Sequence, residues 1–205
     1  EAMVANARAA GMRVLGPNTQ GTANFATGAV LNFNAMYLEM PPADGPVAIV
    51  SQSGAASTMP YHPLRERGIG VRYVLTSGND SDLGVPELAL AAIQDPDVRV
   101  LLLYLESFTD PERLARTAAI ARERDCPIVA IKTGRSEVGI ATARSHTGSL
   151  ATEDRMVDAF FRRHGIWRVD NMSQLARTAE LYLKGWRPRQ RRVVPISNSG
   201  ARSEE

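Results

Sequence analysis

The feature that most constrains the fold is a regular alternation between short apolar runs and longer segments with helical periodicity. The apolar runs are rich in Val, Ile and Leu, as is typical of parallel strands covered on both faces. Strands are expected near residues 46–51, 71–75, 98–105, 127–132 and 166–169. Helices are expected near residues 55–67, 83–94, 111–124, 150–164 and 172–184. Five such units predict an α/β domain with a doubly wound, parallel, five-stranded, flavodoxin-like sheet.

Capping residues mark the ends of several expected helices. Asp110 is followed by Pro111, which favours a helix start because Asp caps free N–H groups and Pro fits the first helical turn. Asn171 offers a second start. Gly68 and Gly165 stand where two helices should end, since glycine adopts the left-handed conformation that terminates a helix. Right-handed crossovers then place every strand-to-helix loop at one edge of the sheet, where ligands bind in such folds.

The two ends of the chain differ from its middle. Residues 1–10 are expected to end an amphipathic helix and residues 12–15 to form a short strand, which suggests the tail of a preceding α/β domain. Near the other end, VVPI-SNSGA resembles VAIV-SQSGA of residues 47–55, so a second domain of the same kind is expected to begin there. The chain is thus interpreted as a piece of a longer protein. Its expected parts are a domain remnant at 1–20, a linker loop at 21–44, a flavodoxin-like domain at 45–186, and a linker with the first strand of a second such domain at 187–205.

Composition excludes several classes of protein. With 44% hydrophobic and 22% charged residues, the chain is neither disordered nor fibrous. The net charge is only +2 and the arginines are spread along the chain, which argues against a nucleic-acid-binding protein. The longest apolar stretch, residues 98–105, is much shorter than the roughly 18 residues of a membrane span. The single Cys126 allows no intrachain disulfide, and zinc-ligand spacing is absent, so a cytoplasmic protein without a resident metal is expected.

The loop SQSGA at residues 51–55 is the first candidate for a binding site. It joins an expected strand to an expected helix, and its small residues allow backbone N–H groups to face an anion at the positive end of the helix dipole. The hydroxyl groups of Ser51 and Ser53 add hydrogen-bond donors. The spacing alone is equally consistent with a tight turn and a helix cap.

A histidine in a long polar loop, residues 133–149, is the candidate nucleophile. His146 lacks the apolar surroundings of a buried structural histidine, and neutral imidazole is nucleophilic near pH 7 when a partner fixes its tautomer. Glu106 follows the most apolar strand, so its carboxylate should emerge at the ligand edge. Asp110 is better placed to cap the next helix, which leaves Glu106 for a site. Considered alone, an exposed histidine without a role is the commoner explanation of His146.

The remaining polar candidates are expected to be structural. Asp80 and Asp82 are expected to cap a helix rather than to line the ligand edge. His62 is expected on a helix surface, and His164 at a helix C-terminus, where a partly charged imidazole favours the dipole. Cys126 is expected to be a buried thiol. Sequence patterns of zinc proteases, serine hydrolases and Walker-type nucleotide sites are absent.

Six motifs in order resemble those of the NDP-forming acyl-CoA synthetases, which include ADP-forming acetyl-CoA synthetase and, more distantly, the succinyl-CoA synthetase α subunit. The motifs are GPNT at 16–19, SQSGA at 51–55, SGN at 77–79, LE at 105–106, KTGRSE at 132–137 and SHTGSLA at 145–151. They cover nearly the whole chain. The resemblance implies the interconversion of acyl-CoA, phosphate and NDP with acid, CoA and NTP, through an acyl phosphate and a phosphohistidine.

The resemblance also implies roles for individual residues. The phosphorylated histidine falls on His146, and the glutamate that orients it falls on Glu106. The helix N-terminus that holds the phosphohistidine falls on Ser51, Ser53, Gly54 and Ala55. The segment that approaches the CoA thiol falls on Asn18 and Thr19. An oriented imidazole and a helix N-terminus suit phosphoryl transfer, which depends on alignment and charge stabilisation.

The family's organisation implies which parts accompany this chain. Residues 1–15 resemble the end of a CoA-binding Rossmann-like domain, and residues 45–186 the flavodoxin-like ligase domain. A second flavodoxin-like domain and an ATP-grasp domain or subunit complete such enzymes, and the latter holds the nucleotide with Mg²⁺. CoA, phosphate, ADP/ATP and carboxylic acids are then substrates rather than tightly bound cofactors. The fragment alone is expected to be inactive, and homo- and hetero-oligomers both remain open.

The chain departs from the family pattern at two places. Thr19-Gln20 stands where the family commonly has Cys-Leu, and Pro60 and Pro63 are expected to shorten or kink the helix after residue 54.

Two other functions remain as alternatives. One is an acyl-CoA-sensing module of a protein lysine acetyltransferase, which needs no phosphoryl carrier such as His146. The other is a plain flavodoxin-like binding or response domain, which would require loop aromatics or an acidic cluster.

Overall fold

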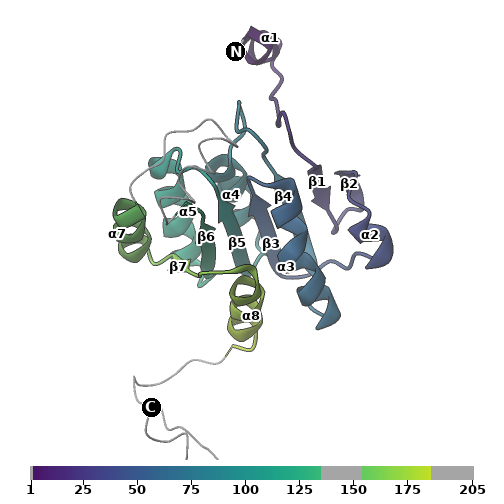
Figure 1. Cartoon of the computed structure of the whole chain (residues 1–205), viewed down its shortest axis with the longest axis vertical. Coiled ribbons are helices and arrows are strands. Elements are labelled where there is room, and N and C mark those ends of the chain that lie inside the picture. Colours follow the sequence, from purple (N-terminus) through teal and green to yellow (C-terminus); the bar gives the residue numbers. More distant parts are fainter. Residues whose placement is uncertain (1, 135–153, 186–205) are drawn as a thin grey trace, which may run out of the picture.

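The computed structural model describes residues 2–134 and 154–185, which form an α/β domain around one sheet (Figure 1). The parallel strands are β3 (Val47–Ser51), β4 (Val71–Thr76), β5 (Val100–Leu105), β6 (Ile128–Lys132) and β7 (Trp167–Arg168). Their order in the sheet is β4-β3-β5-β6-β7, which is the flavodoxin-like order. The five expected strands and the doubly wound parallel arrangement are therefore confirmed.

Helices cover both faces of this sheet. On one face lie α3 (Gly54–Glu66) and α8 (Met172–Leu183); on the other lie α4 (Val85–Ile93), α5 (Pro111–Glu123) and α7 (Asp154–His164). Successive strand residues point to opposite faces, so Leu101 and Leu103 of β5 pack in one core and Leu102 in the other. Each such leucine contributes about 2 kcal/mol when its side chain is fully buried. Burial on both faces is why these strands read as continuous apolar runs.

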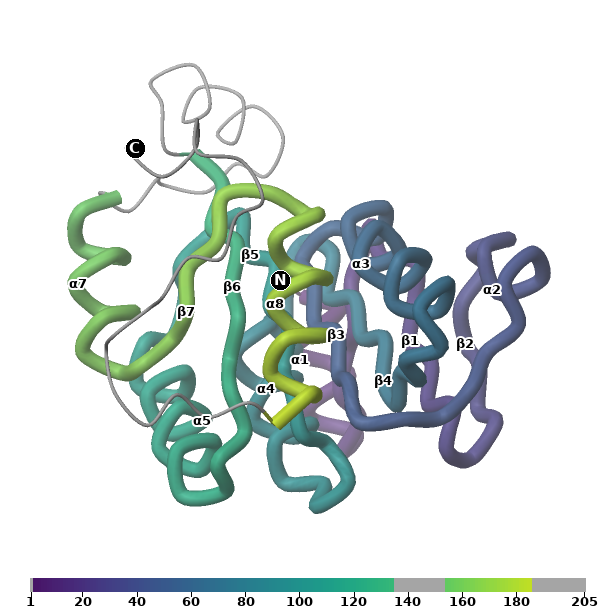
Figure 2. Tube along the Cα trace, turned by 90° about the horizontal axis from the view of Figure 1, so that it is seen from below, coloured from purple at the N-terminus to yellow at the C-terminus, as the bar shows by residue number. Residues whose placement is uncertain are grey.

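The expectation of a linker loop at residues 21–44 is wrong. These residues contain β1 (Gly21–Asn24), β2 (Ala29–Asn32) and α2 (Met36–Glu39), and β1 pairs antiparallel with both β2 and β4. The described sheet thus has seven strands, with the hairpin at the opposite end from α7 (Figure 2). The elements have four residues each, too few to show periodicity in the sequence. A cluster of Phe25, Tyr37 and Tyr61 attaches them to α3, with ring centroids 5.1–5.8 Å apart.

The N-terminal expectations are met only in part. The helix α1 (Ala2–Ala9) is present and buries no residue. Residues 12–15 are extended but do not join the sheet. They are held instead by the backbone N–H of Val14, which donates to the Asp82 carboxylate at 2.7 Å, and by ion pairs of that carboxylate with Arg8 and Arg13. The prediction of a strand at residues 12–15 is therefore wrong, because no strand of the described chain pairs with them.

The helix ends agree with most of the capping signals. The Asp110 side chain accepts from the N–H of Arg113 at 2.9 Å, and Asn171 accepts from that of Gln174 at 2.9 Å. Gly68 and Gly165 follow their helices with φ of 72° and 71°. These starts and stops are confirmed.

Two prolines do not shorten α3, which continues to Glu66 as a helix of 13 residues. Pro60, Tyr61 and Leu64 are buried in it, and Tyr61 donates a hydrogen bond to the Met40 carbonyl at 3.0 Å. Burial of Tyr61 and Leu64 offsets the loss of two backbone hydrogen bonds, each worth about 1 kcal/mol. The expectation of a shorter helix is therefore wrong.

The expected strand near residue 193, the C-terminal linker and His146 lie outside the described residues. None of the helices in the described ranges combines the length and the apolar character needed to cross a bilayer.

Candidate functional site

The turn after β3 prepares the N-terminus of α3 for an anion. Ser53 is the N-cap of this helix, and its side chain accepts from the N–H of Ala56 at 3.3 Å. The N–H groups of Gly54 and Ala55 belong to the first helical turn and cannot have partners within the helix. They are therefore available to an anion at the positive end of the helix dipole.

Ser51 has a different place from the one expected. It is fully buried at the end of β3, and its hydroxyl donates to the Ser53 carbonyl at 2.6 Å. It shapes the turn rather than lining the pocket. The sequence could not separate Ser51 from Ser53, because both flank the same turn and only one of them faces outward.

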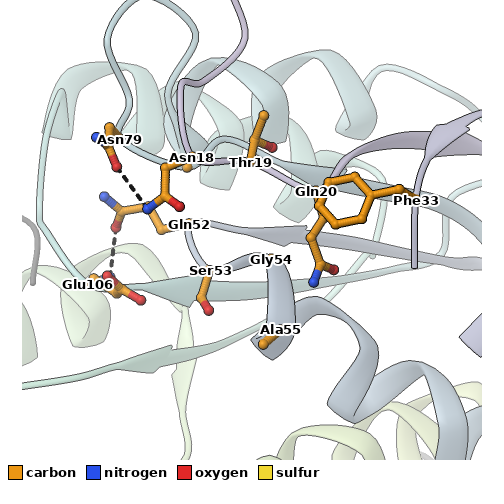
Figure 3. Close-up of a pocket in the computed structure, with 11 residues that line it drawn as sticks. Asn18, Thr19, Gln20, Phe33, Gln52, Ser53, Gly54, Ala55, Asn79 and Glu106 are labelled. Carbon is orange, nitrogen blue, oxygen red and sulfur yellow. Dashed lines mark hydrogen bonds between the residues drawn. The ribbon is translucent and has the colours of Figure 1, made fainter. Parts of the chain in front are cut away.

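A cavity of about 450 Å³ opens at this end of the sheet (Figure 3). Of the residues singled out from the sequence, it is lined by Asn18, Thr19, Ser53, Gly54, Ala55 and Glu106. Gln20, Phe33, Gln52, Gly78 and Asn79 complete the lining. Five separate segments of the chain thus meet beside the carboxyl ends of β3, β4 and β5, as expected for ligand sites in open α/β sheets.

Gln52 holds Glu106 in position and was missed by the sequence analysis. Its buried side-chain oxygen accepts from the N–H of Glu106 at 2.7 Å and from that of Ser107 at 2.8 Å. Its Nε2 donates to the Ser107 hydroxyl at 2.6 Å. These bonds fix the backbone that carries the Glu106 carboxylate into the pocket (Figure 3). The available signal was a glutamine between two serines directly after a buried strand.

The GPNT loop at residues 16–19 is fastened to the loop after β4. The Asn79 N–H donates to the Pro17 carbonyl at 3.0 Å, and the Asn18 Nδ2 donates to the Asn79 side chain at 3.2 Å. A Cβ at Gly78 would lie 2.3 Å from the Pro17 oxygen, so only glycine allows this approach. Asn18 itself has a left-handed backbone with φ of 57°. The loop is thereby held with the Asn18 side chain at the pocket.

Thr19 lines the pocket, but its hydroxyl takes part in a structural network. It donates to the Thr76 carbonyl at 2.5 Å, lies 2.7 Å from the Thr76 hydroxyl, and accepts from the N–H of Gly21 at 3.1 Å. The hydroxyl therefore anchors the loop to β4 and β1. This use explains how a threonine can stand where the resemblance leads one to expect a cysteine.

Neither of the two acidic residues expected to cap a helix is its N-cap residue. Gly84, not Asp80 or Asp82, is the N-cap residue of α4. Burial raises the pKa of Asp80 to about 6, and the charge of Glu106 acts in the same direction. Interactions with Ser77 and the Val85 amide lower this pKa and offset part of the rise. Hydrogen bonds from Arg13 and from the Val14 amide lower the pKa of Asp82. Asp82 therefore anchors the N-terminal segment.

Lys132 is a buried cation at the end of β6, beside the strand that precedes Glu106. Its Nζ donates to the Thr133 carbonyl at 2.6 Å, and burial lowers its pKa, with the charge of Arg168 acting in the same direction. Arg168 pairs with Asp154 and Asp158 and donates to the Lys132 carbonyl at 3.3 Å. This cluster joins the end of β6 to the start of α7.

The remaining candidates lie away from the pocket. Cys126 is buried, as expected, and burial raises the pKa of its thiol to about 11. His62 lies on the surface of α3, 3.5 Å from Glu66. His164 lies in the last turn of α7, as expected, and packs on the ring of Phe160; burial lowers its pKa. Within residues 2–134 and 154–185, no three His, Cys, Asp or Glu side chains gather where they could hold a metal ion.

Comparison with known proteins identifies the same architecture. Residues 44–182 match the family model of the succinyl-CoA ligase like flavodoxin domain. The chain is 35% identical over 173 residues to an ADP-forming acetate–CoA ligase of Methanocaldococcus jannaschii, a match covering 83% of this chain and 23% of the relative. It is 35% identical over 200 residues to the α subunit of ADP-forming acetate–CoA ligase I of Pyrococcus furiosus, covering 97% of this chain and 42% of that subunit.

A solved structure agrees with these matches. The dinucleotide-forming acetyl-coenzyme A synthetase 1 of Ca. Korarchaeum cryptofilum, in complex with phosphate and ADP, superposes with a TM-score of 0.76 at 30% identity. The match covers 85% of this chain and 37% of that one. The chain thus spans less than half the length of each of these relatives. It belongs to the family of succinyl-CoA ligase-like flavodoxin domains found in ADP-forming acyl-CoA synthetases.

Proposed function

We propose that the protein to which this chain belongs is an ADP-forming acyl-CoA synthetase, and that the pocket at the tip of α3 is where the acyl group and the phosphoryl group are exchanged. The reaction interconverts acyl-CoA, phosphate and NDP with acid, CoA and NTP. The supporting observation is the meeting of three features in one cavity: the open N–H groups of Gly54 and Ala55, the Glu106 carboxylate, and the Asn18 loop.

The proposed chemistry has three steps. A phosphate oxygen attacks the thioester carbonyl, the C–S bond breaks, and CoA leaves as a thiolate. The resulting acyl phosphate transfers its phosphoryl group to the imidazole of His146, and the acid leaves as a carboxylate. The phosphohistidine then passes the phosphoryl group to NDP. Each step moves a phosphoryl or acyl group with no change in oxidation state.

The described residues supply binding and alignment for these steps. The N–H groups of Gly54 and Ala55 suit the phosphoryl oxygens, because a helix N-terminus stabilises negative charge without a countercharge that would have to be desolvated. Glu106, fixed through Gln52, is proposed to accept from the imidazole and so to set its tautomer. Asn18 is proposed to face the thiol end of CoA, with Thr19 anchoring the loop beneath it.

The rest of the enzyme is also a proposal. The nucleotide with Mg²⁺ is expected on an ATP-grasp domain or subunit outside this chain, and a relative named as an α subunit is consistent with such a division. Homo- or hetero-oligomers fit this division equally. A cytoplasmic location is part of this proposal, and the single, buried Cys126 requires no oxidising compartment.

The test uses the complete protein with γ-labelled ATP and Mg²⁺. Acid-labile, base-stable label should form on the wild type and be lost in His146→Asn, because the accepting nitrogen is removed. Glu106→Gln should slow labelling about 100-fold through misorientation of the imidazole. His62→Asn is the matched control, since His62 lies on the surface of α3, and it should label normally. Label that persists in His146→Asn, or acyl-CoA binding with no label in the wild type, would contradict the proposal.

A further inference from the structure

The cavity has two unlike sides, separated by the tip of α3 (Figure 3). Glu106, Gln52 and Asn79 lie on one side with their carboxylate and amide groups. Gln20 and Phe33 lie on the other, beyond Gly54. The phosphoryl acceptor, His146, is proposed to act beside Glu106. The acyl group of an acyl phosphate bound at the helix tip would then occupy the opposite side of the cavity.

Phe33 supplies the large apolar surface of this second side. Its exposed fraction is 78%, although it directly follows β2 and lines the cavity. The other described lining side chains are polar or small. An aromatic face at the wall of an otherwise polar cavity is suited to stack on a flat ligand group, because ring stacking needs one surface rather than an enclosing apolar pocket.

The position of Phe33 is set by its neighbours. The Asn34 Nδ2 donates to the Gln20 side-chain oxygen at 2.9 Å, and the Asn34 N–H donates to the Asn32 side chain at 2.9 Å. Gln20 in turn lies against the helix tip, since a Cβ added at Gly54 would be 2.5 Å from its Cγ. Phe33 is thus tied, through the next residue Asn34 and then Gln20, to the helix tip that is proposed to bind the phosphoryl oxygens.

We infer that Phe33 and Gln20 form the acyl-binding wall of this site and that the acyl group they take carries an aromatic ring. The inference rests on the proposed function, since it names the substrate class of the same site. An acetyl group, with one methyl, would leave the Phe33 face in water. A ring joined to the carboxyl carbon directly or through a short rigid spacer covers that face while its carboxyl carbon stays at the helix tip.

The decisive experiment compares two acids in the complete enzyme, with ATP, Mg²⁺ and CoA. Wild type should use 3-phenylpropenoate with a kcat/KM at least tenfold above that for acetate. Phe33→Ala should lower the ratio of the two kcat/KM values about tenfold, as expected for the loss of one aromatic contact. Phe33→Tyr should restore the ratio, since the ring is kept. Leu38→Ala is the control: this side chain is also near the hairpin and exposed, but does not line the cavity, so the ratio should not change.

Three outcomes would overturn the inference: a wild-type preference for acetate, an equal loss for both acids in Phe33→Ala, or no loss for either. Labelling of His146 by ATP involves no acyl group, so label without the aromatic preference refutes the inference alone. If no label forms, calorimetry with 3-phenylpropenoyl-CoA and acetyl-CoA still decides. Tighter binding of the aryl thioester that is lost in Phe33→Ala supports the wall, and equal binding refutes it.

Discussion

The parallel strands and the N-terminal hairpin contribute to one pocket with very different degrees of burial. All residues of β3 and β6 are buried, whereas three of the four residues of β2 are exposed. The parallel region supplies the anion-binding helix tip and Glu106; the N-terminal region supplies Asn18, Gln20 and Phe33. The groups proposed for phosphoryl transfer are therefore supported by the best-packed part of the fold. The proposed acyl wall lies beside the exposed strand β2, which can change with little effect on the core.

The largest effect is expected from truncating matched leucines in the two regions. Leu102→Ala in β5 should lower the free energy of unfolding by about 4 kcal/mol, because a fully buried side chain leaves a cavity between the strand and α8. Leu31→Ala in β2, where the exposed fraction is 79%, should cost under about 0.5 kcal/mol. Urea unfolding of both variants measures the difference. Equal losses would show that the hairpin is as much part of the core as β5.

A smaller effect is expected at the contact between the two regions. Gly78→Ala should cost about 2–3 kcal/mol, since the new Cβ meets the Pro17 carbonyl and φ is 66°. Gly28→Ala, with φ of 74° and open space around it, carries only the backbone strain of about 1 kcal/mol. Hydrogen exchange at the Asn79 amide should accelerate in the first variant alone. Unchanged exchange there would mean that the loop does not depend on this approach.

The smallest effect is expected from the pH dependence of stability. The raised pKa of Asp80, about 6, means that its contribution to stability is present below about pH 4 and is lost as the pH rises through 6. Asp80→Asn stays neutral and tolerates the left-handed φ of 52°, so its advantage over wild type should grow to about 2 kcal/mol by pH 7.5. Urea unfolding at pH 4 and pH 7.5 measures it. A constant difference between the two pH values would show that Asp80 is not desolvated.

How well the sequence predicted the site depended on the kind of evidence that each residue offered. Ser53, Gly54, Ala55 and Glu106 directly follow strong strands, so the rule that ligands bind at strand ends located them without knowledge of any contact. The prediction that Ser51 lines the pocket was wrong, because the direction of its side chain depends on the geometry of the turn. Gln52 and Asn79 also follow strands, but their roles depend on hydrogen bonds to partners far along the chain. The hairpin residues Gln20 and Phe33 follow no periodic element, so no such rule located them.

By itself, the sequence determined the order and type of the main elements, because hydrophobic periodicity and helix caps act over a few residues and are visible wherever they occur. Tertiary structure alone decided that residues 21–32 join the sheet and that Gln52 holds Glu106. It also decided that Thr19 anchors its loop and that Phe33 reaches the pocket. These outcomes depend on close approaches between distant segments, such as Gly78 against Pro17 and Gln20 against Gly54, and such approaches exist only after the chain has packed.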